Sequence, residues 1–328
     1  MGIGEPGNGP AGADVRATIR GSLRQRVLRA LTMPWRARGA VIVCLDPDVA
    51  IGSVPVRVFR RRKLVVDVHE DYGALLDDRA WATGIRGWIA RRMVRLASAV
   101  AARADLTVVA DDHIPPYAHR CRRRIVVQNL PDMSLIAAPG RGDGTALRAV
   151  YVGDVRRSRG AQSMIEALAT APGWTLDIVG PVSKDDAPWL AERLAEPDLA
   201  GRVRLHGRQP PAAAWRIARD AVVGLALLES TTAFRAAMPT KVYEYLAAGM
   251  AVLATPLPRV EELLAESGGG VVVNDAEDAS AALRHWTGAG AAELEKLRAA
   301  ARVWSDGLSP AASPYDQLAN ELPAIRVR

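Results

Sequence analysis

Short apolar runs recur along the chain, and each ends in a polar or glycine-containing segment. The runs have the length of a buried parallel strand, and amphipathic segments of helical length separate them. This alternation is typical of βαβ units, so the sequence predicts an α/β fold with parallel sheets. Strands are expected at residues 40–45, 64–68, 106–109, 125–127, 149–152, 175–179, 203–205, 221–227, 251–254 and 270–273.

Apolar residues three or four positions apart predict the helices. Two predicted helices in the first part of the chain, residues 15–31 and 85–102, have arginines beside their apolar stripes. In the second helix the stripe is formed by Trp88, Ile89, Met93, Leu96 and Val100. Because both helices must cover a sheet, the stripes are expected to face the core. Further helices are expected at residues 162–169, 188–195, 212–218, 241–248, 279–287, 291–303 and 314–322.

The alternation lapses at about residues 132–145, which are rich in alanine, glycine and proline. This stretch is typical of an interdomain linker. We therefore expect two Rossmann-like doubly wound domains, residues 1–138 and 139–328, with residues 1–14 disordered. In such sheets ligands bind at the carboxyl ends of the strands, so a cleft between the two domains is the expected site.

Composition narrows the class of protein. Hydrophobic residues make up 49% and charged residues 24%, as in ordinary globular proteins. No apolar run approaches the roughly 18 residues that span a bilayer. The two cysteines, Cys44 and Cys121, are too few for a disulfide framework or a zinc site of the CxxC type. We therefore expect a cytoplasmic protein with free thiols.

The positive charge is confined to one part of the chain. Residues 1–138 contain 22 Lys and Arg against 13 Asp and Glu, whereas the remainder contains 21 against 23. A localised positive field attracts an anionic substrate, an anionic membrane surface or nucleic acid. Aromatic residues are only 5% and are not interleaved with the arginines, which disfavours nucleic acid. A soluble arginine-rich face remains the simple alternative.

The first candidate site is the loop at residues 152–160. Gly153 and Gly160 permit a tight turn and close backbone approach, and Arg156, Arg157 and Arg159 lie between them. Arginines beside a helix N-terminus favour phosphate. The alternative is a basic loop without a ligand.

The second candidate lies at the start of the predicted helix at residues 241–248. Pro239 precedes Thr240 and Lys241, whose backbone N–H groups would point out of the helix end toward an anion. Glu244, one turn further on, is positioned to reach a ribose diol. The alternative is a capped helix with a solvated lysine and glutamate.

These residues carry a resemblance to a known family. Residues 239–252 resemble the nucleotide-sugar motif of family-4-type retaining glycosyltransferases, which have the GT-B fold. Weaker resemblances follow the family's order at residues 45–48, 67–70, 104–109, 129–132, 151–160 and 205–208, and at Trp304. Together they span roughly residues 40–320.

The resemblance implies retaining transfer of a sugar from a nucleoside diphosphate sugar to an acceptor hydroxyl. It implies neither a metal nor another cofactor. The acceptor would be a small molecule or a lipid-linked one. A lipid-linked acceptor is expected if the basic amphipathic helices of the N-terminal domain provide peripheral membrane contact, an expectation that comes from those helices rather than from the resemblance. The final helix would pack back toward the N-terminal domain, which is the acceptor side.

The same resemblance implies individual roles. His69 would contact the donor sugar, and Arg156 and Arg159 would stabilise the departing phosphate. Gly207 and Arg208 would lie near the base. Gly153, Gly160, Thr240, Lys241 and Glu244 would hold the nucleotide sugar. Glu70 and Asp71 would contact an acceptor hydroxyl or merely cap the next helix, whereas His113, His119 and His285 have no such role.

Three departures keep alternatives open. Ala236 stands where the family has a second acidic residue, and Asp154 where it often has arginine. The family's first strand and glycine-rich acceptor loop are not recognisable, so the N-terminal domain is expected to be incomplete. The alternatives are a catalytically impaired transferase-like subunit, which binds a nucleotide sugar or a partner, and a nucleotide-sugar epimerase on the same fold.

Overall fold

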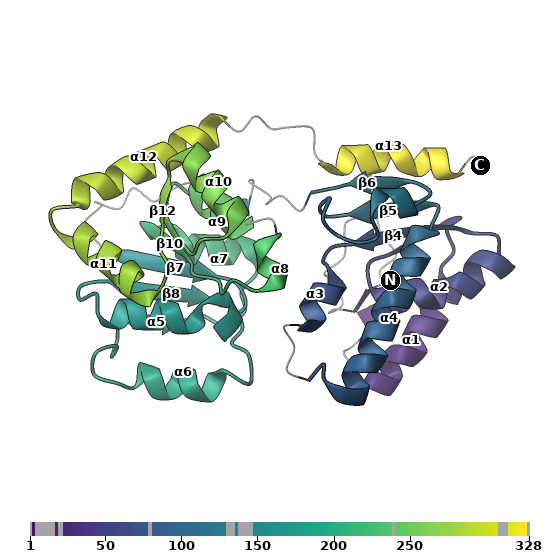
Figure 1. Ribbon diagram of the computed structural model, residues 1–328, viewed down its shortest axis with the longest axis horizontal. Helices are drawn as coiled ribbons and strands as arrows, with labels where there is room; N and C mark the ends of the chain where they lie inside the picture. The colour runs from purple at the N-terminus through teal and green to yellow at the C-terminus, as the bar shows by residue number, and fades with distance from the viewer. Residues whose placement is uncertain are drawn as a thin grey trace. The chain divides into compact units, whose positions relative to one another are not determined.

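A computed structural model describes residues 2–3, 17–18, 22–77, 81–128, 135–136, 147–237, 240–307 and 314–326. The chain divides into two compact units. Unit 1 comprises Met1–Asn129 and Ala311–Arg328, and unit 2 comprises Leu130–Pro310. Each unit contains one large parallel sheet, of four and six strands respectively, which confirms the predicted α/β class (Figure 1). No helix among the described residues is long and apolar enough to cross a membrane.

The sheet of unit 1 has the strand order β3-β4-β5-β6, which follows the sequence. Its strands are β3 (Val41–Cys44), β4 (Lys63–Val68), β5 (Leu106–Val109) and β6 (Arg124–Val126). All neighbours are parallel, with Val68 opposite Val109 at the carboxyl ends of the two central strands. Parallel crossovers are right-handed, so the helices that connect β3 to β4 and β4 to β5 cover the same face. These are α2 (Pro47–Phe59), α3 (Tyr72–Asp77) and α4 (Gly84–Ala102).

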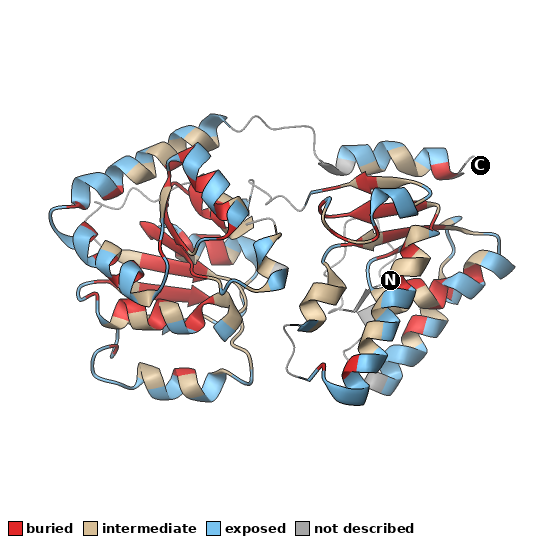
Figure 2. Cartoon of the chain, in the orientation of Figure 1, coloured by how far each residue is buried: buried red, intermediate tan, exposed pale blue. Residues whose placement is uncertain are grey.

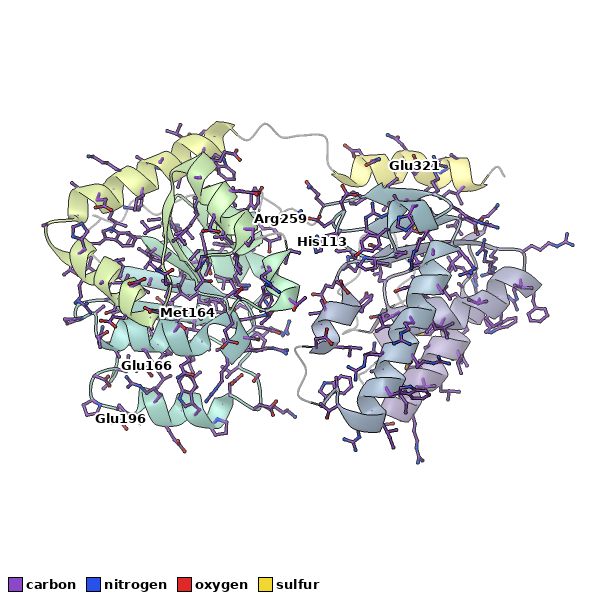
Figure 3. All side chains as sticks on the ribbon, viewed as in Figure 1. His113, Met164, Glu166, Glu196, Arg259 and Glu321 are labelled. Atoms are coloured by element: carbon purple, nitrogen blue, oxygen red, sulfur yellow. The ribbon has the colours of Figure 1, made fainter. Side chains whose placement is uncertain are left out.

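The opposite face of this sheet is covered by α13 (Pro314–Arg326), which follows unit 2 in the chain. Ile325 is buried there against Val65 and Val108. Glu321 of α13, labelled in Figure 3, forms an ion pair with Arg123 beside β6. A distant segment therefore completes one of the two hydrophobic clusters of unit 1.

The first helix starts later than the predicted residue 15. Ala17–Thr18 form a short strand (β2) beside Gly2–Ile3 (β1), and α1 spans Leu23–Arg36. Ser22 fixes its start through a capping box, in which its side chain and that of Gln25 each accept from the other's backbone N–H. The disorder expected for residues 1–14 lies outside the described residues, apart from Gly2–Ile3.

The helix predicted at residues 85–102 forms α4, but its orientation contradicts the expectation. Its buried residues are Gly87, Ala97 and Ala101. Trp88 and Leu96, from the predicted core stripe, are instead exposed. A Cβ at Gly87 would lie 1.9 Å from the carbonyl oxygen of Ala82, so the close approach selects small residues. Hydrophobic periodicity located the helix but assigned it the wrong buried face.

The sheet of unit 2 has the strand order β12-β11-β10-β7-β8-β9. The first strand, β7, lies beside β10, and the direction of strand addition reverses between them. This is the topological switch point of a doubly wound sheet. The strands are β7 (Arg148–Val152), β8 (Thr175–Val179), β9 (Val203–Leu205), β10 (Val223–Ala226), β11 (Ala251–Ala254) and β12 (Gly270–Val272).

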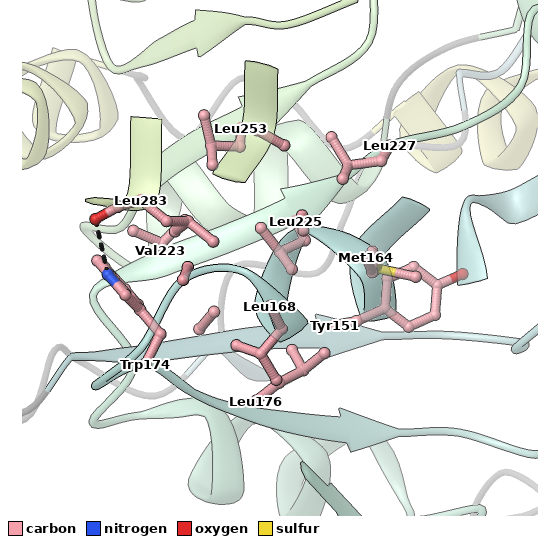
Figure 4. Close-up of a cluster of buried hydrophobic side chains, with 14 of the residues drawn as sticks. Tyr151, Met164, Leu168, Trp174, Leu176, Val223, Leu225, Leu227, Leu253 and Leu283 are labelled. Carbon is pink, nitrogen blue, oxygen red and sulfur yellow. Dashed lines mark hydrogen bonds between the residues drawn. The ribbon is translucent and has the colours of Figure 1, made fainter. Parts of the chain in front are cut away.

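Helices cover both faces of this sheet, and the four central strands, β11, β10, β7 and β8, are almost entirely buried between them (Figure 2). One hydrophobic cluster includes Trp174, whose indole N–H donates to the carbonyl of Leu283 at 2.8 Å (Figure 4). The helices are α5 (Ala161–Ala169), α6 (Ala187–Leu194), α7 (Pro211–Ala218), α8 (Thr232–Arg235), α9 (Thr240–Ala247), α10 (Pro258–Ser267), α11 (Ala276–Thr287) and α12 (Ala291–Gly307). None of the helix ranges given above covers α8 or α10, although α10 lies between two predicted strands, where a helix is expected.

Candidate functional site

Helix α9 is fixed to the switch point of unit 2 by Tyr245. The ring of this fully buried residue packs on β10, where a Cβ at Gly224 would lie 2.2 Å from it. Its hydroxyl accepts a hydrogen bond of 3.0 Å from the backbone N–H of Val152, the last residue of β7. Tyr245 therefore sets the position of α9 relative to both strands that flank the switch point.

One helical turn before Tyr245, Lys241 reaches over the glycine that follows β7. A Cβ at Gly153 would lie 2.5 Å from Nζ of Lys241, and Gly153 has a φ of 144°. The ammonium also lies 5.4 Å from the ring centroid of Tyr151. Glycine at position 153 thus allows the lysine of one motif to lie against the loop of the other.

The electrostatics of this arrangement favour an anion. Burial and, after it, the charge of the neighbouring Arg159 together lower the pKa of Lys241 to about 8, whereas Glu244 and Asp154 oppose the shift. Burial likewise raises the pKa of Glu244, and Lys241 opposes that shift. The positive charges of Lys241 and Arg159 are therefore not fully compensated by the nearby carboxylates, and a bound anion would stabilise both charges.

Tyr151 fixes the course of the loop beneath Lys241. It is fully buried on β7, and its hydroxyl donates to the carbonyl of Asp154 at 2.7 Å. Burial raises the pKa of Tyr151 to about 12, with Arg159 opposing. The phenol therefore remains a neutral donor at physiological pH, close to the two cations.

Gly160 lets the same loop cross to the neighbouring strand. It has a φ of 82°, and a Cβ there would lie 1.9 Å from the carbonyl oxygen of Leu227, just after β10. The backbone N–H of Glu229 donates to the carbonyl of Ser158 at 3.0 Å. The glycine-containing loop thus bridges the ends of β7 and β10, where ligands bind in this class of sheet.

The three arginines of the loop have different neighbours. Arg159 lies 5.8 Å from the ring centroid of Phe234, and its charge acts on Lys241. Arg156 forms an ion pair of 3.2 Å with Asp154 inside the loop. Arg157, in contrast, lies near Asp186 and Trp189. Only Arg159 therefore shares the immediate environment of Lys241 through these contacts.

The predicted base-binding residues follow β9, at the edge of the sheet. Gly207 has a φ of 63°, and Arg208 beside it is exposed. Nε2 of His206 lies 2.6 Å from the buried carboxylate of Asp177, which also accepts from Arg148 at 2.5 Å. Gly207 and Arg208 therefore lie at the same strand-end edge as Gly153, but two strands away from β7.

His69 belongs to unit 1, where it directly follows β4. Its Nε2 lies 3.4 Å from Oδ2 of Asp67. Burial raises the pKa of Asp67, and the histidine opposes this shift. Oδ1 of Asp71 accepts from the backbone N–H groups of Gly73 and Ala74, at 2.8 and 3.1 Å. Of the two roles considered for Asp71, the structure therefore shows the helix cap.

A second Asp–His pair, not predicted from the sequence, lies at the end of the neighbouring strand β5. Nδ1 of His113 lies 3.0 Å from Oδ1 of the buried Asp111, just after β5. Because β4 and β5 are parallel neighbours, this pair and Asp67–His69 share one edge of the sheet. The spacing Asp-x-His at the carboxyl ends of two consecutive predicted strands was the available signal. Nowhere in the described ranges are three or more His, Cys, Asp or Glu residues grouped so as to hold a metal ion.

Known proteins are similar to this chain in sequence over one segment and in fold over most of its length. Residues 156–306 match a family model described as glycosyl transferase-like. No curated protein sequence matches the chain at a significant level. The matched segment contains η3 (Arg157–Arg159), α9 and the loop after β9.

Several solved structures share the fold at low sequence identity. Sucrose-phosphate synthase from Thermosynechococcus elongatus is 16% identical, with a TM-score of 0.69, over 92% of this chain and 78% of that protein. HepE from Anabaena, in complex with UDP-glucose, is 15% identical with a TM-score of 0.69, over 94% and 86%. WaaG, a glycosyltransferase of lipopolysaccharide biosynthesis, is 13% identical with a TM-score of 0.62, over 90% and 95%. The chain has the GT-B fold, as the resemblance implies, and residues 156–306 are similar in sequence to a glycosyl transferase-like family.

Proposed function

We propose that this protein is a retaining glycosyltransferase that moves a sugar from a nucleoside diphosphate sugar to an acceptor hydroxyl. The observation that carries the proposal is the convergence of Lys241, Arg159 and Gly153 at the switch point of unit 2. Two incompletely compensated cations against a glycine backbone form a site suited to a diphosphate. The UDP-glucose complex of the similarly folded HepE supports this choice of ligand class.

In this proposal unit 2 binds the donor. The loop from Gly153 to Gly160, together with Thr240 and Lys241, holds the diphosphate. Glu244 accepts hydrogen bonds from the ribose. Gly207 and Arg208, at the end of β9, lie near the base. The diphosphate and ribose are thus assigned to residues at the switch point, whereas the base would extend along the strand ends toward the sheet edge.

The chemistry needs positive charge where the leaving group forms. The bond between the anomeric carbon and the diphosphate oxygen breaks, and the acceptor oxygen bonds to the same face of that carbon. The departing diphosphate gains negative charge and takes up the proton of the acceptor hydroxyl. Arg159, Arg156 and Lys241 would stabilise that charge without a metal ion, and His69 would contact the donor sugar.

Unit 1 is the acceptor side in this proposal. The Asp–His pairs after β4 and β5 provide groups that can hydrogen-bond a sugar or lipid-linked hydroxyl. The acceptor is a small molecule or a lipid-linked one, reached through peripheral membrane contact of the basic unit 1. A cytoplasmic location fits the two free thiols, Cys44 and Cys121.

The test starts with donor binding. Calorimetry with UDP, GDP, ADP and inorganic pyrophosphate identifies the diphosphate preference, and Lys241→Met is compared with Lys184→Met at an exposed position. We expect loss of affinity only in the first variant. Incubation with the corresponding nucleotide sugars and candidate acceptors should then release nucleotide, and NMR should show the donor's anomeric configuration in the product. Equal binding by both variants would contradict the assigned site.

A second candidate is a transferase-like subunit that binds a nucleotide sugar without turning it over. Ala236, directly after α8, favours it because the resemblance predicts a carboxylate there. This candidate predicts that diphosphate affinity depends on Lys241 while nucleotide release stays at the uncatalysed rate with every donor and acceptor. Release above that rate, lost in Arg159→Ala, excludes it.

A further inference from the structure

Helix α4 of unit 1 turns its large apolar side chains away from its own sheet. Trp88 is 61% exposed, Ile85 79%, and Ile89, Met93 and Leu96 are each 44% exposed or more. These residues recur at intervals of three and four along one face of the helix. Together with Arg92 and Arg95, four of them line a shallow groove along that outer face. A contiguous exposed apolar stripe of this kind marks an interaction surface.

The charges on α4 have a single sign. The helix carries Arg86, Arg91, Arg92 and Arg95 and has no acidic residue. Within the described part of the chain, none of these four forms an ion pair with a carboxylate. The guanidinium of Arg92 lies 5.5 Å from the ring centroid of Trp88, so a cation and an indole share one surface position.

The exposed apolar surface continues onto the neighbouring helices. Helix α2 packs against both α1 and α4 on one side of the sheet (Figure 1). On α1, Leu28 and Leu31 are more than half exposed, and on α2 so are Val58 and Phe59. Helix α1 also has no acidic residue. The feature therefore belongs to the helical layer of unit 1 and extends beyond one helix.

We propose that the outer face of α4 is a membrane-docking surface, through which unit 1 lies on an anionic lipid bilayer. An interfacial helix needs an apolar face at the depth of the acyl-chain boundary and cations at headgroup level, and α4 provides both. Tryptophan and arginine suit this level because each combines an apolar body with a polar end. A protein partner for this face would need acidic residues opposite four arginines, whereas an anionic bilayer supplies negative charge along its whole surface.

The docking surface narrows the substrate class. A transferase held on a bilayer by its acceptor-side unit would act on an acceptor that is carried in that bilayer. This consequence rests on the proposed function, but the docking itself does not, because it involves no residue of the donor site.

The experiment is vesicle flotation of the full-length protein without donor. We expect binding to vesicles of phosphatidylglycerol and phosphatidylcholine at low salt, weaker binding at high salt, and little binding to pure phosphatidylcholine. Arg92→Gln with Arg95→Gln should lower the partition coefficient by about tenfold or more. The matched control changes Arg216 of α7 and Arg219, the residue directly after this helix, two exposed arginines of unit 2.

The apolar half of the surface has its own test. Trp88→Ser with Leu96→Ser should abolish vesicle binding, whereas Val303→Ser, at a more exposed apolar residue on α12 of unit 2, should leave it unchanged. UDP affinity, measured in the same samples, should be equal in all variants. Failure of UDP binding with intact flotation would contradict the proposed function and leave the docking surface standing.

Two outcomes would overturn the docking proposal. One is the absence of flotation with anionic vesicles at low salt, or an equal loss in the control variants. The other is sedimentation velocity showing that wild-type protein self-associates and that Trp88→Ser makes it monomeric without changing flotation. The exposed face would then be an interface between copies of the chain.

Discussion

The pKa of Lys241 gives the donor site a pH dependence that can be measured. With a pKa of about 8, about 90% of the lysine is protonated at pH 7 but only about 10% at pH 9. If the protonated form holds the diphosphate, the apparent Kd of the nucleoside diphosphate should rise about tenfold between these two pH values. Lys241→Met should show no comparable rise, and ionisation of the nucleobase itself is common to both proteins.

The loss of affinity expected for Lys241→Met at pH 7 follows from the hydrogen bond between the lysine ammonium and the diphosphate. A hydrogen bond to a charged group contributes about 1.5–3 kcal/mol, so removal of the ammonium should weaken binding by about thirtyfold. Lys184→Met, at an exposed position, should change the Kd by less than about twofold. Binding near pH 8 should also take up a proton, because the anion raises the pKa of Lys241 toward its ordinary value. Calorimetry in two buffers of different ionisation enthalpy measures this uptake.

In the unliganded protein, the lowered pKa of Lys241 should make folding stability increase with pH, whereas diphosphate affinity decreases with pH. The pKa of Lys241 is lower in the folded chain than in the unfolded chain, so the unfolded chain binds more protons between pH 8 and 10.5. This lysine should therefore make the folded state more stable as the pH rises through that window. Denaturant unfolding of wild type and Lys241→Met across the window isolates the difference. A Kd that is flat from pH 7 to pH 9, or equally steep in Lys241→Met, would refute the reasoning.

Three further changes probe neighbouring parts of the site. Glu244→Ala should weaken UDP about tenfold and leave pyrophosphate unchanged, because only UDP has a ribose; calorimetry compares the two. Arg159→Ala should lower turnover and diphosphate affinity together, and Arg159→Lys should restore both better than Arg156→Lys does; a negligible effect of Arg159→Ala would make the loop structural. Tyr245→Phe leaves the backbone N–H of Val152 without its acceptor and should cost about 1–3 kcal/mol of unfolding free energy in urea. An unchanged unfolding midpoint would show that another group replaces the hydroxyl.

The central strands of the two large sheets were predictable because they are buried on both faces. Residues such as Val65 and Leu253 lie in uninterrupted apolar runs, and local composition alone identifies them. All ten large-sheet strands overlap their predicted ranges. The short strand β2 was not predictable, because residues 15–31 have helical spacing throughout and only the capping box at Ser22 marks the true start.

The orientation of α4 and the contacts of Lys241 depend on tertiary structure. Periodicity identifies one face of a helix as apolar, but it does not show that Gly87, Ala97 and Ala101 are the buried residues instead. The sequence places Lys241 at the beginning of a helix, yet its approach to Gly153 depends on how Tyr245 docks that helix. Such contacts join residues about ninety positions apart, and no local pattern encodes them.

The position of α13 has a consequence for biosynthesis. Ile325 fills the hydrophobic cluster between this helix and the strand residues Val65 and Val108, which are synthesised long before it. Unit 2, in contrast, is a continuous segment, and all of it has left the peptidyl-transferase centre before α13 is made. During translation one face of the first sheet therefore stays uncovered until α13 has been made. Chaperones that recognise exposed valine-rich strands would find their binding site on this nascent chain, and docking of α13 would remove it.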